Sequence, residues 1–88
     1  MRIDKYLKVS RLIKRRTVAK DIIDRGVIKI NGRVAKPSHN VAVGDELDLV
    51  LGRHHLVVRV LKVEEVAKKA TASEFYEIIS DELLEIEE

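Results

Sequence analysis

The first 32 residues constrain the fold of this chain most, because their apolar side chains recur with a helical period and then give way to a turn and a strand. The spacing predicts one helix from Ile3 to about Ser10 and a second from about Arg16 to Asp24. Gly26 is placed to end the second helix, because glycine adopts the left-handed conformation at low steric cost. We refer to residues 2–24 as the two-helix unit.

Strand patterns follow the two-helix unit. Asn31-Gly32 separates two short β-rich runs, which predicts a hairpin with a type I′ turn. Leu47, Leu49 and Leu51 alternate with Glu46, Asp48 and Val50, which indicates a strand with one buried face. Residues 56–63 form the longest β-rich run. The order of elements predicts an α+β fold, in which the two-helix unit packs on a small, mainly antiparallel sheet.

The C-terminal part of the chain shows another change of period. Phe75, Ile78 and Ile79 are spaced as on one side of a helix, and we predict a C-terminal helix over residues 67–85. Its acidic end is expected to fray from Glu82.

Length and composition limit the domain count. We expect one domain over residues 1–88, with a core over about 1–63 and an acidic helix or tail over about 67–88. The absence of cysteine excludes disulfides and thiolate metal sites. No apolar run approaches the roughly 20 residues of a membrane helix, and the N-terminus lacks the apolar core of a secretory signal. We therefore expect a cytoplasmic protein without membrane contact.

Charge is distributed unevenly along the sequence. Residues 1–36 hold 12 Lys and Arg against three Asp, a net charge of +9. Residues 37–70 are balanced, whereas residues 71–88 hold seven acids and no Lys or Arg. A basic density of this kind on two short helices is typical of a protein that binds a nucleic-acid backbone. The acidic end suggests a second, different contact surface.

RNA is the polyanion that we expect as partner. The chain has only three aromatic residues, which argues against stacking of single-stranded bases and favours recognition of backbone charge and RNA shape. A helix-turn-helix DNA binder is a weaker alternative, because the second helix offers no Asn or Gln to read bases. The candidate RNA-binding residues are Arg2, Asp4, Lys5, Lys8, Arg11, Lys14, Arg15, Arg16 and Lys20.

Catalytic and metal motifs are missing from the sequence. Asp4 has no second catalytic group at a defined spacing, so we expect it to start the helix or to orient an arginine. Ser10 and Thr17 belong to no nucleophile motif, and the glycines occur singly. His54 and His55 are adjacent, so in a strand they would point to opposite faces and would not form a shared metal site. A turn or strand-end role is expected for them. We expect no enzyme, no cofactor and no metal.

Three motifs carry a resemblance to a known family, and they are Arg2-Ile3-Asp4-Lys5-Tyr6-Leu7, Arg16-x-x-Ala19 and Ile23-x-x-Gly26-x-Ile28-x-Ile30-Asn31-Gly32. Over about residues 1–51 the chain resembles the RNA-binding domain named after small-subunit ribosomal protein S-four. The run over 7–17 is similar to the stand-alone ribosome-associated quality-control factors of that family. Many family members have Ser where Arg15 stands, so we expect the second helix to lack a hydroxyl cap.

The resemblance implies a function. It implies a non-enzymatic factor that binds large ribosomal subunits obstructed by a nascent chain on tRNA, through large-subunit rRNA and that tRNA. It also implies a partner elongation factor that recruits alanyl-tRNA and extends the stalled chain with alanines; we expect a monomer. Matching positions would form the RNA-facing surface, and they are Arg2, Asp4, Lys8, Arg11, Arg15, Arg16 and Lys20.

Two alternatives stay open within the resemblance. One is a heat-shock-type protein that binds free large subunits with nascent chains. The other is a detached RNA-binding domain of an RNA-modifying enzyme.

Overall fold

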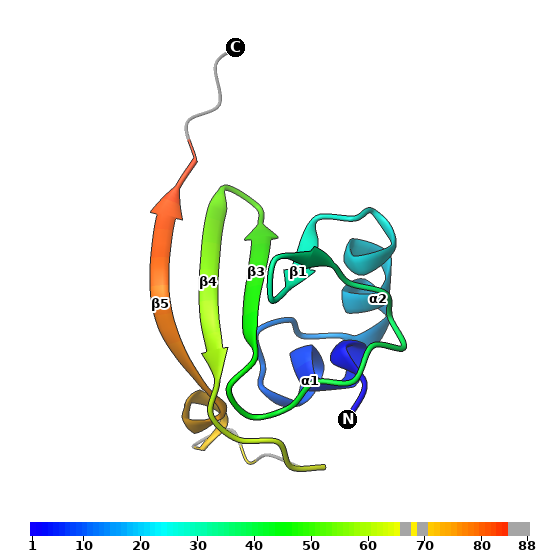
Figure 1. Cartoon of the computed structure of the whole chain (residues 1–88), viewed down its shortest axis with the longest axis vertical. Helices are drawn as coiled ribbons and strands as arrows, with labels where there is room; N and C mark the ends of the chain where they lie inside the picture. The colour runs from blue at the N-terminus through cyan, green and yellow to red at the C-terminus, as the bar shows by residue number, and fades with distance from the viewer. Residues whose placement is uncertain (66–67, 69–70, 85–88) are drawn as a thin grey trace.

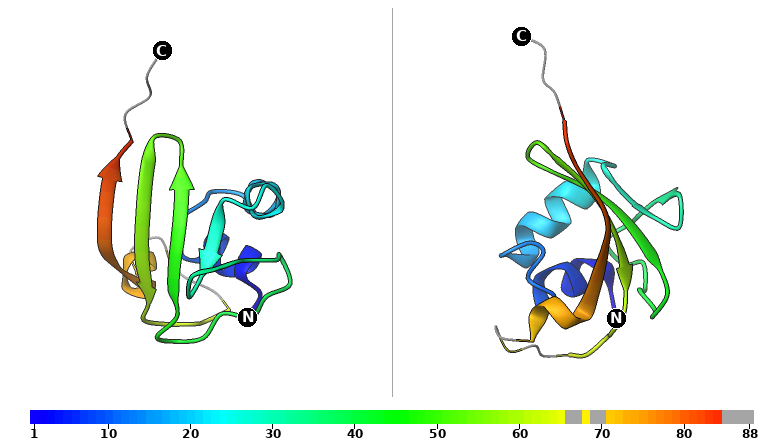
Figure 2. Two further views of the ribbon diagram at one scale, coloured as in Figure 1. Left: turned by 45° about the horizontal axis from the view of Figure 1, so that its top comes forward. Right: turned by 90° about the vertical axis from the view of Figure 1, so that its left-hand side faces the viewer.

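The computed structural model describes residues 1–65, 68 and 71–84 (Figure 1). Five strands form one antiparallel sheet in the order β2-β1-β3-β4-β5, and both α-helices lie on one face of it (Figure 2). The elements are α1 (Ile3–Val9), α2 (Arg16–Asp24), β1 (Ile28–Ile30), β2 (Arg33–Val34), β3 (Glu46–Leu51), β4 (His54–Val60), the 3₁₀ helix η1 (Ala72–Phe75) and β5 (Tyr76–Leu83). The predicted α+β class is confirmed. None of the helices among the described residues has the length and apolarity of a membrane span.

The core lies between the helices and the sheet. The predicted alternation in β3 is confirmed, because Leu47 and Leu49 are buried while Glu46 is exposed. Val18 in α2 is 42% exposed, whereas Ala19 and Ile23 of the same helix are buried. The buried residues of the two helices are Ile3, Asp4, Tyr6, Leu7, Val9, Ala19 and Ile23.

The helix end and the hairpin turn that the sequence predicts are both present. Gly26 has a φ of 76° directly after α2, and Asn31 and Gly32 have φ values of 49° and 82° in the turn between β1 and β2. Positive φ at both central residues is what a type I′ hairpin requires. Arg15 occupies the N-cap position of α2, and its side chain makes no capping hydrogen bond. The predicted absence of a hydroxyl cap is therefore confirmed.

The predicted C-terminal helix is wrong. Residues 72–75 form a single 3₁₀ turn, and residues 76–83 form β5, which pairs with β4. β4 offers a row of backbone partners, and those long-range hydrogen bonds outweigh the helical spacing of Ile78 and Ile79. Residues 67, 69–70 and 85, which the prediction also included, lie outside the described residues.

Phe75 anchors the C-terminal segment to α1. Its side chain is buried, and its ring centroid lies 6.4 Å from that of Tyr6. The Tyr6 hydroxyl donates a hydrogen bond of 2.6 Å to the Phe75 carbonyl. Burial, and to a lesser degree the neighbouring Tyr76, raises the pKa of the Tyr6 phenol, which therefore stays a neutral donor. Tyr6 is thus a core residue.

Candidate nucleic-acid interface

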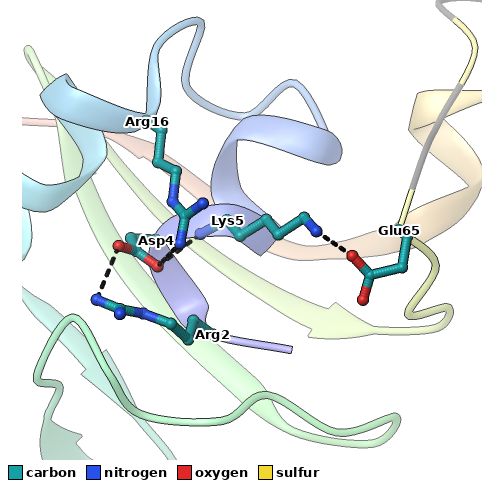
Figure 3. Close-up of polar contacts among 5 residues, drawn as sticks. All are labelled: Arg2, Asp4, Lys5, Arg16 and Glu65. Carbon is teal, nitrogen blue, oxygen red and sulfur yellow. Dashed lines mark hydrogen bonds and ion pairs between the residues drawn. The ribbon is translucent and has the colours of Figure 1, made fainter.

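One carboxylate joins the starts of the two helices. Asp4 is buried in the first turn of α1, and its Oδ2 accepts a hydrogen bond of 3.3 Å from Nη2 of Arg2. Its Oδ1 accepts a bond of 3.4 Å from Nη2 of Arg16, and the backbone N–H of Lys5 donates to the same oxygen at 2.9 Å (Figure 3). We call Arg2, Asp4 and Arg16 the Asp4 cluster.

The sequence places each member of the Asp4 cluster at a helix end. Arg2 is the N-cap residue of α1, and Arg16 is the first residue of α2. A carboxylate in the first turn is favoured by the partial positive charge of the helix N-terminus. Two guanidinium groups compensate the burial of the Asp4 charge, which would be costly alone. Where the sequence predicted one arginine beside Asp4, the structure brings two.

Both arginines keep donors free for a ligand. Their side chains are 47% exposed, whereas the side chain of Asp4 is only 4% exposed. A guanidinium group carries five N–H donors in a planar fork, and Asp4 engages one nitrogen of each in the structure. The remaining donors can meet phosphate oxygens with the geometry that Arg forms best. The cluster is therefore an oriented pair of anion-binding groups.

The other candidate cations belong to the same two-helix unit. Five of them are exposed, and they are Lys8, Arg11, Lys14, Arg15 and Lys20. Arg11 follows α1 with a φ of 63°, a left-handed conformation that is uncommon outside glycine. Because that conformation closes the turn after α1, Arg11 holds its charge at the corner between the two helices.

Comparison with known proteins identifies the unit. A model of the S4 domain matches residues 1–47, which include the whole Asp4 cluster and the hairpin. The chain belongs to the S4 domain family. A protein of Streptococcus pneumoniae named RQC P-site tRNA stabilizing factor is 51% identical to this S4 domain protein over 85 residues, or 97% of each chain. A protein of the same name from Listeria monocytogenes is 54% identical over 82 residues, or 93% of this chain and 89% of the relative.

A solved structure shares the fold of this S4 domain protein. The trimeric structure of heat shock protein 15 from Vibrio cholerae superposes with a TM-score of 0.85 at 27% sequence identity. The match covers 91% of this chain and 82% of the other.

One contact of this S4 domain was missed by sequence reasoning. The Lys5 ammonium pairs with the carboxylate of Glu65, which lies 60 residues away in sequence (Figure 3). The hydrogen bond from Lys5, and then its charge, lower the pKa of the Glu65 carboxyl. Lys5 thus differs from Arg2 and Arg16, because its acid partner is an exposed residue from outside the two-helix unit. No local sequence signal could have shown a pairing between segments so far apart.

The two adjacent histidines pair with carboxylates of neighbouring strands. Nδ1 of His54 lies 3.1 Å from Oδ1 of Asp81 in β5, and Nε2 of His55 lies 2.6 Å from Oδ1 of Asp48 in β3. Both open β4, the strand-end position that the sequence favoured. Each side chain therefore links strands, and the two do not converge on a common point.

Proposed function

We propose that this S4 domain protein binds RNA of the large ribosomal subunit as a non-enzymatic factor of ribosome-associated quality control. It contacts large-subunit rRNA and the tRNA of an obstructing nascent chain together. The observation that carries the proposal is the Asp4 cluster, in which one buried carboxylate orients two half-exposed arginines. The relatives named RQC P-site tRNA stabilizing factor support the tRNA partner.

The physical role of Asp4 supports recognition of shape over simple attraction of charge. A basic surface that only attracted polyanions would gain nothing from a buried acid at its centre. Asp4 instead fixes Arg2 and Arg16, so that less side-chain entropy is lost when each meets a phosphate. The surrounding Lys and Arg side chains contribute the sequence-independent, salt-dependent part of the affinity.

The finer function follows from the family resemblance and is part of the proposal. The bound protein supports C-terminal alanine tailing of the stalled chain, together with an elongation factor that recruits alanyl-tRNA. It acts in the cytoplasm as a monomer. The proposed RNA-binding residues are Arg2, Asp4, Lys5, Lys8, Arg11, Lys14, Arg15, Arg16 and Lys20.

A second candidate function has a specific observation in its favour. The similarity of fold to heat shock protein 15 supports the heat-shock-type alternative, for which the family resemblance implies binding of free large subunits that carry nascent chains. Both functions use large subunits that hold a nascent chain on tRNA, and they differ in whether the bound protein supports alanine tailing of that chain.

A pair of arginine variants tests the proposal. Arg16→Ala should weaken sedimentation with large subunits and reduce the salt slope of binding by about one unit, because one phosphate contact is lost. Arg59→Ala is the matched control, because Arg59 in β4 has the same charge and a side chain 50% exposed, but lies outside the two-helix unit. The assigned surface would be refuted if Arg16→Ala sedimented with large subunits as well as the wild type does. An equal loss of binding in both variants would also refute it.

Alanine addition separates the two candidate functions. On subunits that hold a nascent chain on tRNA, the quality-control proposal expects the protein to increase C-terminal alanine tailing by the elongation factor. Binding to these subunits without any effect on tailing would instead favour the heat-shock-type function.

A further inference from the structure

β5 forms an open edge of the sheet. It is the last strand in the sheet order and pairs with β4 on one side, and among residues 1–65, 68 and 71–84 no strand pairs with its other side. It is eight residues long, whereas β2 at the opposite edge has only two. In Figure 1, β5 is the outermost strand on one side of the molecule, and α1 and α2 lie toward the other side. A long open edge presents unpaired backbone donors and acceptors to a further strand.

The side chains of this edge are more apolar than a protected edge needs. Ile78 is 53% exposed, Ile79 is 45% exposed and Leu83 is 65% exposed. Edge strands that only avoid association carry few large apolar groups. These three residues therefore supply apolar area that a partner could cover.

The charge of β5 restricts what that partner can be. Residues 76–83 contain Glu77, Asp81 and Glu82 and no Lys or Arg, and all three acids are exposed. RNA is excluded as the partner because phosphates would be repelled. A second copy of this chain is also disfavoured, because pairing of two β5 strands would bring their acids together.

We infer that β5 is a docking edge for an extended, basic segment of another protein. The segment adds a sixth strand to the sheet, and main-chain hydrogen bonds hold it. Its Lys or Arg side chains lie near Glu77 and Glu82 on one face of the sheet, and its apolar side chains cover Ile78 and Leu83 on the other face. This inference is independent of RNA binding, which uses the two-helix unit.

Two labelled peptides test the inference. The probe is a peptide of about nine residues that alternates lysine and valine, the length of an ordinary strand. Its control has the same charge but carries proline in place of alternate valines, which removes backbone donors. We expect the probe to bind the full chain at least about tenfold more tightly in fluorescence anisotropy. The bound probe should also slow hydrogen exchange of the backbone amides in β5. Equal binding of both peptides, or no saturable binding, would overturn the inference.

A pair of double variants locates the binding surface. Glu77→Gln with Glu82→Gln should weaken binding of the probe by about fivefold, because charge pairs across strands on one face of the sheet are lost. The matched control is Asp21→Asn with Asp24→Asn, which neutralises two exposed acids of α2 and should change nothing. An equal effect of the two variants would show charge attraction alone and would overturn the inference. The β5 variant should retain large-subunit binding within about threefold, so the RNA proposal is tested separately.

Discussion

The two-helix unit and β5 differ in how their charged side chains are held. In the two-helix unit, the buried Asp4 lies between two arginines that start different helices. In β5, Glu77 lies 4.0 Å from Arg59 and Asp81 lies 3.1 Å from His54, and all of these side chains are about half-exposed. A buried carboxylate fixes the positions of its partners, whereas exposed pairs contribute little and rearrange easily. Arg2 and Arg16 are therefore positioned before a ligand arrives, whereas the acids of β5 can change partners.

The two regions are joined through Phe75, and breaking that joint should have the largest effect. Phe75→Ala removes a buried ring that packs against Tyr6, and we expect unfolding free energy to fall by about 3–5 kcal/mol. Urea denaturation followed by circular dichroism measures the loss. Leu61→Ala is the control, because Leu61 is exposed, and it should cost less than about 1 kcal/mol. Equal costs would mean that β5 is not anchored on the helices by Phe75.

The β1–β2 hairpin, which follows the two-helix unit in sequence, gives the next largest effect. Gly32→Val places a β-branched residue at a φ of 82°, and we expect a loss of about 1–3 kcal/mol in stability. A Cβ at this position would meet no atom within 4 Å, so the loss would come from backbone strain alone. Arg33→Val, at an exposed strand position of the same hairpin, should be nearly neutral. An unchanged melting temperature of Gly32→Val would remove the type I′ turn from the account.

Sequence reasoning predicted the features that depend on neighbouring residues. The bounds of α2, the left-handed Gly26 and the Asn31-Gly32 turn are all set within a few residues. β5 was missed because strand pairing is a long-range interaction. A register shift beside Val57 and Val58 also leaves Ile79 without a partner, and this bulge hides the alternation of a strand.

The candidate site was predictable in composition but not in geometry. The density of Lys and Arg in residues 1–36 could be counted from the sequence. The burial of Asp4 between the starts of two helices could not be predicted from it. The single Asp4–arginine contact expected from sequence is a pair of contacts in space. Glu65 was invisible because its partner Lys5 lies in another region of the sequence.

The Lys5–Glu65 pair gives a pH prediction of smaller size. Because Lys5 lowers the pKa of Glu65 in the folded protein, the pair stabilises the fold at pH values above the unfolded pKa. That contribution is lost as pH falls through the folded pKa. An NMR titration should show the Glu65 carboxyl protonating at lower pH in the wild type than in Lys5→Met. Coincident titrations would show that the pair does not form.

The Lys5–Glu65 pair also provides a test of whether Lys5 contacts RNA. Glu65→Gln frees Lys5 for phosphate, and RNA affinity should rise by at most about fivefold, as expected for an exposed ion pair. Glu64→Gln is the matched control, because Glu64 pairs with Lys62 and lies outside the two-helix unit. No rise in affinity of Glu65→Gln relative to Glu64→Gln would mean that Lys5 does not contact RNA.

The most direct test of the account neutralises the buried acid at the centre of the basic surface. Asp4→Asn makes the chain more positive by one charge, so attraction of charge alone would raise RNA affinity. We predict the opposite for binding to large subunits at fixed salt, below the melting temperature of each variant. The affinity should fall by at least about fivefold, because Arg2 and Arg16 lose their fixed positions. Asp21→Asn, which removes an exposed acid of α2, should cause no loss. An Asp4→Asn protein that binds as tightly as the wild type, or more tightly, would contradict the proposed role of the Asp4 cluster.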